Sequence, residues 1–224
     1  MVREFTAHEL WFLVLAVRWT IALSAIAFVA GGAGGLVVAL SRVSRSGVLA
    51  GMATAYIKVV QGTPLLMQLY LVYFGSTLLR LGSDAWTAAA LGLALYASAF
   101  LGEIWRGCIQ AVPRAQWEAA RALGLGYPSQ LRFIILPQAS RIALPPTVGF
   151  LVQLVKGTSL ASIIGFTELT RAAAVVNNAT FRPLMVYTAV AGLYFILCWP
   201  LSLLSEHLER RLERAGASPV SFQI

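Results

Sequence analysis

Five long apolar stretches run through this chain, and each is long enough to cross a bilayer as a helix. A crossing helix needs about 20 apolar residues, because the hydrocarbon core offers its backbone no water to bond to. The composition agrees, since 58% of the residues are hydrophobic, 12% are charged and the mean hydropathy is +0.76. We therefore predict an all-α, polytopic membrane protein whose residues 1–224 form a single transmembrane domain. The predicted crossings are at about 19–41, 55–79, 85–106, 138–163 and 183–205.

The distribution of arginines indicates which way these crossings point, because cytoplasmic loops carry the excess of Lys and Arg. Basic residues gather near the first and third connections and after the last crossing, at Arg42, Arg45, Arg106, Arg114, Arg121, Arg132, Arg141, Arg210, Arg211 and Arg214. The opposite side holds fewer, at Arg3, Arg18, Arg80, Arg171 and Arg182. We predict that the amino terminus lies outside and that the carboxyl terminus and the third connection are cytoplasmic. Because the basic residues are scattered at helix ends, the net charge of +8 does not indicate a nucleic-acid partner.

Local patterns predict how some of the crossings begin and pack. Residues 5–17 are typical of an interfacial helix that leads into the first crossing, with Trp11 and Trp19 as anchors. Gly31 and Gly35 form a small-xxx-small face that lets another helix approach closely. Glu103 and Arg106 are spaced for an ion pair one helical turn apart.

The third connection, at about 107–137, is too long to serve only as a link between two crossings. Pro113 suits the first turn of a helix, and the residues from Gln116 to Ala122 favour its continuation. Gly124 and Gly126 then end it, and Pro128 starts a second short helix. The residues therefore predict a short helix–turn–helix at the cytoplasmic surface. They leave open whether it rests on lipid headgroups or contacts another protein.

The spacing within this connection resembles the EAA loop of membrane subunits in ATP-binding cassette (ABC) importers. Glu118, Ala119 and Ala120 are followed after three residues by Gly124, and after nine more by the run Ile134–Pro137. Three further motifs are similar to permeases of the polar amino acid family, whose solutes are of the histidine, glutamine, arginine and glutamate type. They are the Gly-Thr-Pro-Leu-Leu of 62–66, the Gly-Glu-Ile-Trp-Arg-Gly of 102–107, and Lys-Gly-Thr-Ser-Leu of 156–160 with Glu168 and Leu169 beyond it. Together the motifs cover about residues 20–205.

Three positions depart from the pattern of that family. Gln61 stands where an arginine is common, and Ala115 stands where a glycine is usual. Gly157 replaces a usual acidic residue, which removes a charge near the expected solute path.

The resemblance implies a permease subunit of an amino acid importer in the bacterial inner membrane. It implies two cytoplasmic ATP-binding subunits, a second permease chain that is identical or related, and an extracytoplasmic solute-binding protein. The chain contains no phosphate-binding G-x-x-x-x-G-K-[ST] motif, so ATP and Mg are expected on the ATPase partners and this chain is not expected to be an enzyme. Two cysteines and two histidines give no metal-ligand spacing, so no metal site is expected.

Two sets of residues are candidates for function. The resemblance assigns contact with the ATPase to Gln116, Trp117, Glu118, Ala119, Ala120, Leu123 and Gly124. The solute pathway is expected at a polar patch within and after the fourth crossing, formed by Gln153, Lys156, Thr158, Ser159 and Glu168. Charges inside a membrane are costly and usually functional, and a cation beside hydroxyls offers donors to the carboxylate of an amino acid. The alternative is that Lys156 has a structural role, with its ammonium group bound by carbonyls or by a contact with another subunit.

Two other classes of function compete with this interpretation. A transporter or channel driven by an ion gradient would need an acidic or histidine relay within the crossings, and Asp84, His8 and His207 lie outside them. A membrane-embedded enzyme would need a catalytic constellation such as paired carboxylates or a serine with its base, and none is apparent. The sequence therefore favours the importer permease.

Overall fold

The computed structural model describes residues 4–80, 82 and 84–214, and these residues form helices and no strand. The helices are α1 (Ala7–Val43), α2 (Gly47–Gln61), α3 (Leu65–Leu78), α4 (Ala85–Ala111), α5 (Arg114–Ala122), α6 (Tyr127–Gln130), α7 (Leu136–Gly157), α8 (Leu169–Thr180) and α9 (Pro183–Arg214). A π-helical turn, η1 (Leu131–Ile135), leads into α7, and a 3-10 helix, η2 (Thr158–Ile164), follows it. The all-α prediction is confirmed for this part of the chain.

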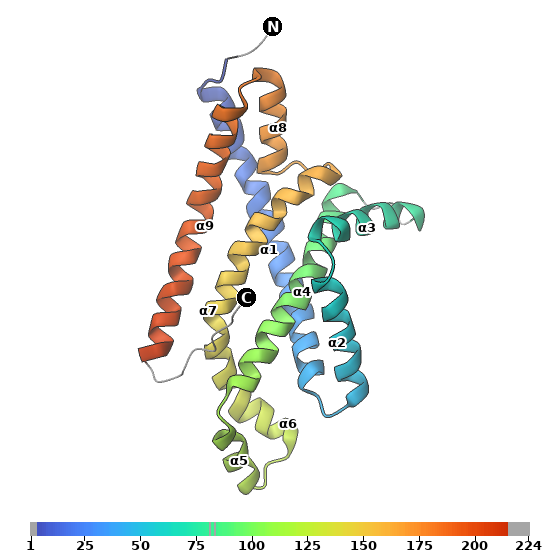
Figure 1. The fold of residues 1–224 in the computed structure, drawn as a ribbon, viewed down its shortest axis with the longest axis vertical. Coiled ribbons are helices and arrows are strands. Elements are labelled where there is room, and N and C mark those ends of the chain that lie inside the picture. The colour runs from blue at the N-terminus through green and yellow to red at the C-terminus, as the bar shows by residue number, and fades with distance from the viewer. Residues whose placement is uncertain (1–3, 81, 83, 215–224) are drawn as a thin grey trace.

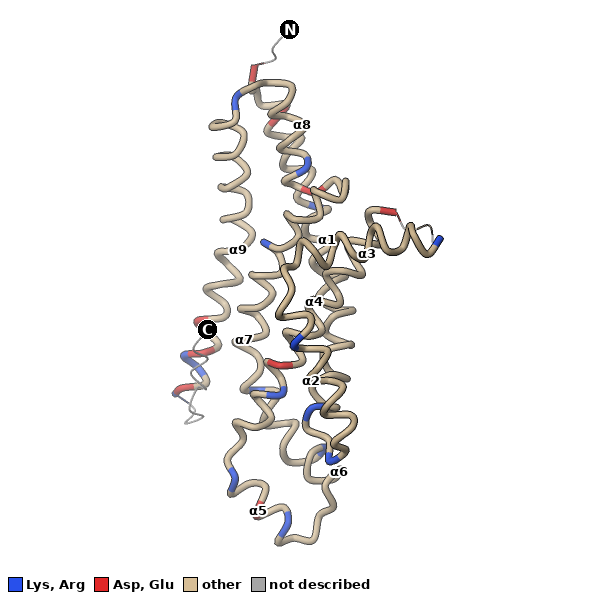
Figure 2. Tube along the Cα trace, turned by 45° about the vertical axis from the view of Figure 1, so that its right-hand side comes forward, with Lys and Arg blue, Asp and Glu red and all other residues tan. Residues whose placement is uncertain are grey.

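Four helical runs are long and apolar enough to cross a membrane: α1, α4, the run Tyr127–Ile164 through α7, and α9. They pack in the sequence α1 to α4, α4 to α7 and α7 to α9, along the long axis of the molecule in Figure 1. The α5–α6 hairpin lies at one end of this axis and α8 at the other. Charged residues lie around α8 and from the lower end of α9 downward, and the band of the long helices between these levels carries few of them (Figure 2). This arrangement is that of a multi-pass membrane protein, because a bilayer excludes charge from its centre.

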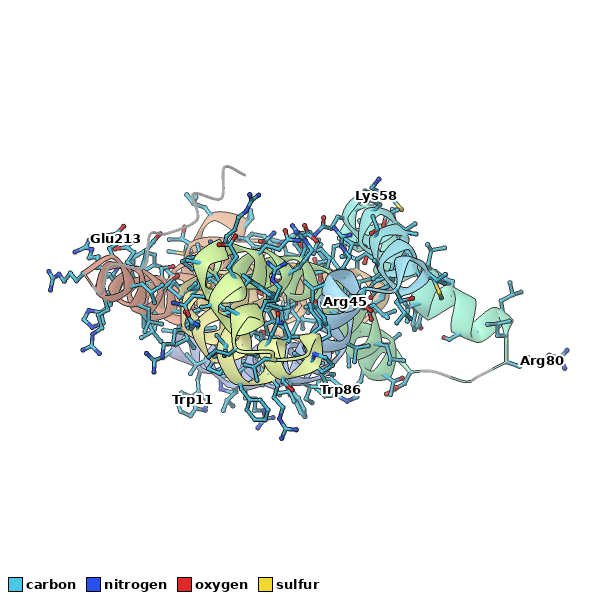
Figure 3. The ribbon with its side chains drawn as sticks, turned by 90° about the horizontal axis from the view of Figure 1, so that it is seen from below. Trp11, Arg45, Lys58, Arg80, Trp86 and Glu213 are labelled. Carbon is cyan, nitrogen blue, oxygen red and sulfur yellow. The ribbon has the colours of Figure 1, made fainter. Side chains whose placement is uncertain are left out.

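The stretch predicted as the second crossing, at about 55–79, is not one helix. It divides into α2 and α3 at Pro64, which has no N–H to continue the hydrogen bonding of α2. The side-chain amide of Gln68 bridges the division by donating to the carbonyl of Val60 at 2.7 Å and to that of Thr63 at 3.0 Å. α3 runs sideways, away from the bundle, and Arg80 beyond its end lies far from the body of the molecule (Figures 1 and 3).

α1 is one unbroken helix of 37 residues, so the interfacial helix predicted at 5–17 is not a separate element. A capping box fixes its start, with the backbone N–H of Thr6 donating to the carboxylate of Glu9. Trp11 and Trp19 are 60% and 43% exposed, and Figure 3 shows Trp11 pointing away from the body. Both tryptophans are therefore free to lie among lipid headgroups, as the sequence predicts.

The predicted small-residue face of α1 packs directly on α4. A Cβ atom at Gly35 would lie 3.0 Å from the Cβ of Leu101, and one at Gly31 would collide with Ala97. Gly102 of α4 completes the contact, because a Cβ there would lie 2.6 Å from Cγ1 of Val38. The backbones of α1 and α4 approach closely only because these positions carry no side chain.

Replacing Gly31 by alanine is expected to destabilise the protein by about 1–3 kcal/mol, the usual cost of overpacking a close contact. The measurement is thermal unfolding of the purified protein in detergent. Gly51→Ala is the matched control, because nothing lies within 4 Å of the position that its new Cβ would occupy. The explanation would be wrong if both variants unfolded at the same temperature as the wild type.

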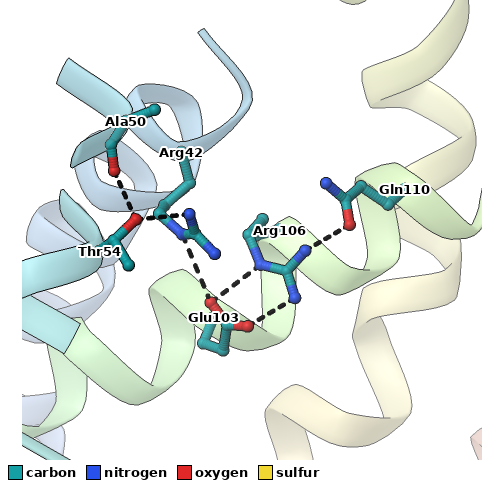
Figure 4. A network of polar contacts seen from close by, with 6 residues as sticks. All are labelled: Arg42, Ala50, Thr54, Glu103, Arg106 and Gln110. Carbon is teal, nitrogen blue, oxygen red and sulfur yellow. Dashed lines mark hydrogen bonds and ion pairs between the residues drawn. The ribbon is translucent and has the colours of Figure 1, made fainter. Parts of the chain in front are cut away.

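The predicted ion pair between Glu103 and Arg106 is present and belongs to a larger network (Figure 4). Arg106 Nη2 lies 2.5 Å from Glu103 Oε1. Arg42 of α1 adds a longer contact, with its Nε 3.8 Å from Glu103 Oε2, and donates to the hydroxyl of Thr54 at 2.6 Å. One carboxylate on α4 therefore links α4 to α1, and Arg42 extends the link to α2.

Candidate functional site

The third connection forms the predicted helix–turn–helix, which projects beyond the ends of the long helices (Figure 1). α5 starts directly after Pro113 and ends in a left-handed turn at Gly124, whose φ is +74°. The N–H of Leu125 donates to the carbonyl of Ala120 at 3.2 Å, and that of Gly124 donates to Arg121 at 2.9 Å. This is the Schellman pattern, in which glycine accepts a conformation that other residues resist. Gly124 thus sets the direction in which the chain leaves α5.

The residues predicted to contact the ATPase divide between two faces of α5. Ala120 is 1% exposed and Trp117 is half-buried, so both face the rest of the chain. The remaining members point to solvent, and Leu123 is 77% exposed. The exposed set is Gln116, Glu118, Ala119, Leu123 and Gly124. The projecting hairpin thus exposes the Glu118 carboxylate, the small side chain of Ala119 and the apolar side chain of Leu123. Such a surface is suited to a protein partner.

The buried face of α5 rests on a hydrophobic cluster at the ends of the long helices nearest α5. Its buried members come from the end of α4 and the start of α7, and Trp117 packs on them together with Val43 of α1. The buried members are Ile109, Val112, Ile135 and Ala139. α5 is therefore attached to three of the long helices and is not a loose loop.

Two of the residues predicted to line the solute pathway are exposed in the mostly apolar second half of α7. Lys156 and Gln153 lie one turn apart on α7, and both are accessible in the single chain. The side chain of Gln153 donates to the hydroxyl of Tyr96 on α4 at 3.2 Å, which fixes its orientation. The hydroxyls of Thr158 and Ser159 instead donate to the carbonyls of Val155 and Lys156, each at 2.7 Å.

Glu168, the fifth predicted pathway residue, is fully buried between η2 and α8. Its carboxylate caps α8 by accepting the N–H of Arg171 at 2.8 Å, and it accepts the hydroxyl of Tyr194 on α9 at 2.9 Å. Burial raises the pKa of this carboxyl above its ordinary value, although these hydrogen bonds act in the opposite direction. Glu168 therefore joins α8 to α9 within the chain, apart from the exposed pair on α7.

Gly157, one of the three positions that depart from the pattern of the resembled family, lies next to apolar side chains. The residue is half-buried, and a Cβ atom there would lie 3.2 Å from Cδ2 of Leu65 and 4.0 Å from Cδ2 of Leu93. A carboxylate at this position would meet an apolar wall. Glycine at position 157 thus leaves room for the side chain of Leu65.

Several residues that position these sites lie too far away in the sequence to be predicted from local spacing. Tyr96 and Tyr194 hold Gln153 and Glu168 from other helices, and Tyr127 of α6 contacts α1. An aromatic residue with a hydroxyl in an apolar stretch is the only local signal, because a buried hydroxyl needs a partner.

An open pocket of about 570 Å³ is lined by residues of α1, α4 and α7. Its lining is almost wholly apolar, with Gly32, Leu36, Trp105, Ala139 and Ala143 among its members. It includes neither Gln153 nor Lys156, so it is not the predicted polar pathway. Among the described residues, no group of three or more His, Cys, Asp or Glu side chains is placed to hold a metal ion.

Comparison with known proteins identifies the family to which this chain belongs. Residues 31–214 match the family described as the inner membrane component of binding-protein-dependent transport systems. This chain belongs to that family. It is therefore a permease, the membrane-spanning subunit of an ABC importer, as the sequence motifs predict.

The permease is similar along most of its length to several characterised or assigned relatives. It is 35% identical over 200 residues to the probable amino-acid ABC transporter permease protein YckA of Bacillus subtilis (strain 168), covering 89% of this chain and 88% of the relative. It is 32% identical over 216 residues to the glutamine transport system permease protein GlnP of Escherichia coli (strain K12), covering 94% and 99%. A crystal structure of an amino acid ABC transporter with histidines superimposes with a TM-score of 0.86 at 34% identity, covering 95% and 100%.

Proposed function

We propose that this permease forms one half of the transmembrane pathway of an ATP-driven importer of polar amino acids in the bacterial inner membrane. The substrate class rests on the relatives, which are permeases for glutamine, cystine or nopaline by name. The proposed partners are a second permease chain, identical or related, and an extracytoplasmic solute-binding protein. Two cytoplasmic subunits would bind ATP and Mg and carry out the hydrolysis. Residues 1–224 would act as a single transmembrane domain with the coupling loop at about 107–137.

We propose five crossings, with the amino terminus outside and the carboxyl terminus in the cytoplasm. In Figure 1 the chain descends through α1, rises through α2, descends through α4, rises through α7 and descends through α9. α2 is too short to span alone, so α2 and α3 together would make the second crossing, with its outer part turned sideways. This places α5 on the arginine-rich side, which the Lys/Arg bias assigns to the cytoplasm.

In this assembly α5 would sit in a groove of the ATPase and pass on its movements. Glu118 and Ala119 would make the contact, with Gln116, Leu123 and Gly124 around them, and Trp117 and Ala120 would hold α5 to the permease. Closure of the ATP-bound subunits would displace α5, and the long helices would turn with it between two global states. Nucleotide drives this change only because it binds one of those states more tightly.

The solute would pass along the exposed polar side of α7. A lysine that is exposed within an apolar crossing is costly in lipid, and a second permease chain or a water-filled path would remove that cost. Lys156 would attract the carboxylate of an amino acid, and Gln153 would offer both a donor and an acceptor. Thr158 and Ser159 would border this path, and Glu168 would shape its outer end by fixing α8 to α9.

The observation that carries the proposal is the α5 hairpin, which projects from the bundle and exposes Glu118, Ala119 and Leu123 to a partner. The test is to express the permease with the transport genes that neighbour it, purify it, and reconstitute it in liposomes containing ATP. We expect an ATPase to copurify and a mixture of radiolabelled glutamine, histidine, arginine and glutamate to be taken up. Replacing the P-loop lysine of the ATPase should reduce uptake to background. Uptake that persists with that inactive ATPase would favour a gradient-driven transporter instead.

A further inference from the structure

Tyr127, the first residue of α6, contacts three other parts of the cytoplasmic end at once. Its hydroxyl donates to the backbone carbonyl of Val43, the last residue of α1. Its ring stacks on that of Trp117 in α5, with the centroids 6.1 Å apart and an angle of 19° between the planes. The guanidinium carbon of Arg45, in the turn between α1 and α2, lies 4.7 Å from the centroid of the same ring. We call these four residues, Val43, Arg45, Trp117 and Tyr127, the aromatic clamp.

Each contact in the clamp satisfies a physical need of the group involved. The last carbonyls of a helix have no partner within the helix, and Tyr127 supplies one for Val43. The face of the aromatic ring is electron-rich and attracts the Arg45 cation. The Trp117 ring is half-buried between the Tyr127 ring and the hydrophobic cluster that also contains Val43. The clamp therefore attaches the projecting hairpin to α1 as well as to α4 and α7, with which it is continuous in sequence.

α1 extends this attachment to the opposite end of the molecule. It is unbroken, and at about 1.5 Å per residue its 37 residues span about 55 Å. Its close glycine contacts with α4 limit independent bending. Near its other end the Thr20 hydroxyl accepts the N–H of Leu169 in α8 at 3.2 Å, and Leu13 packs with the apolar face of α8. α1 thus provides a continuous connection between the α5 end of the molecule and α8.

We infer that Tyr127 is a positioning residue that makes α5 and α1 move as one body, so that displacement of α5 by the ATPase reaches α8 at the far end. This inference rests on the proposed function, because it needs a partner that moves α5. It adds a role for α1, which the coupling loop motif does not include. Without the clamp, the ATPase would displace α5 while α1 stayed behind, and hydrolysis would proceed with less transport.

The test is Tyr127→Phe in the full complex with its ATPase, reconstituted in liposomes with the same four radiolabelled amino acids. The substitution removes the hydroxyl but keeps the ring, so the contacts with Trp117 and Arg45 remain. We expect the ATPase to stay attached and the unfolding temperature to change little. The amount of solute taken up per ATP hydrolysed should fall about two- to tenfold, the effect of losing one hydrogen bond. Tyr187→Phe, at an exposed tyrosine of α9, is the matched control and should leave the ratio unchanged.

The ratio separates a coupling role from a purely structural one. If uptake and hydrolysis fell together in Tyr127→Phe, the residue would only support the fold, and the inference would be overturned. If the wild type transports normally and Tyr127→Phe takes up as much solute per ATP hydrolysed, this inference is overturned while the proposed function stands. A wild-type complex without ATP-dependent uptake would remove the proposed function, and this inference would fall with it.

Discussion

Glu118→Lys is expected to release the ATPase from the permease while leaving the permease folded in the membrane. Glu118 is exposed on α5 and makes no hydrogen bond or ion pair within the described part of the chain. Its reversal therefore costs the isolated permease little, because exposed charges contribute little to stability. In the proposed complex the new lysine would face groups that accommodate a carboxylate. We expect association with the ATPase to weaken at least about tenfold, or about 1.4 kcal/mol, and uptake to fall in parallel.

The measurement is copurification of the ATPase with a tagged permease, together with uptake in liposomes. Glu206→Lys is the matched control, because it makes the same charge reversal at an exposed position of α9, where Glu206 lies 3.7 Å from Arg210. Ala119→Trp tests the same surface by bulk instead of charge, since Ala119 is exposed. Ala120 does not suit this purpose, because it is 1% exposed and a larger side chain there would disturb the packing of α5. If the ATPase associated normally with both the Glu118→Lys and the Ala119→Trp permease, the proposed coupling role of α5 would be wrong.

Features carried by neighbouring residues could be predicted from the sequence. The α5–α6 hairpin follows from Pro113, Gly124 and Pro128, because each acts on the backbone at its own position. The close approach of another helix to α1 follows from the spacing of Gly31 and Gly35, and the Glu103–Arg106 pair follows from helical periodicity. Each of these predictions uses the residues of one helix or turn, so its signal is local. The spacing does not identify α4 as the helix that approaches.

The sequence contains a signal for the division between α2 and α3, but the high hydropathy of the stretch outweighs it in the prediction. Gly62, Thr63 and Pro64 are typical of a turn, yet they lie inside a stretch that is apolar enough to span. A hydropathy value is an average over a window of residues. It therefore shows neither the effect of a single proline on the backbone nor a turn of the chain. A better prediction would give proline more weight than the average, because the missing N–H acts on the backbone whatever surrounds it.

The partners of the functional side chains could not be predicted, because they are distant in sequence. Tyr194 is 26 residues from Glu168, Tyr96 is 57 from Gln153, and the Val43 carbonyl is 84 from Tyr127. Polar residues in the same region were predicted to share one pathway. In the structure the carboxylate of Glu168 accepts hydrogen bonds within the chain, whereas Lys156, twelve residues earlier, is exposed. Burial depends on which helices come together, and spacing along one helix does not contain that information.

Lys156→Met is expected to raise the solute concentration needed for half-maximal uptake by about 10- to 150-fold. The side chain is exposed on α7, and no salt bridge to it is found among the described residues, so its charge is available to a solute. A hydrogen bond to a charged group contributes about 1.5–3 kcal/mol, and methionine keeps the length of the side chain without the charge. Gln153→Leu should act in the same direction with a smaller effect, because its amide is neutral and already donates to Tyr96.

Lys58→Met is the control for this experiment, because Lys58 is also an exposed lysine on an apolar helix, at the edge of the molecule in Figure 3. Uptake is measured against solute concentration for both variants, with the amount of assembled complex determined in parallel. If Lys156 binds the solute, its loss changes the concentration dependence while the complex stays intact. Equal behaviour of the two variants, or a loss of assembly in Lys156→Met alone, would assign Lys156 to a structural contact. The exposed side of α7 would then be a surface for the second permease chain, and the solute would have to pass elsewhere.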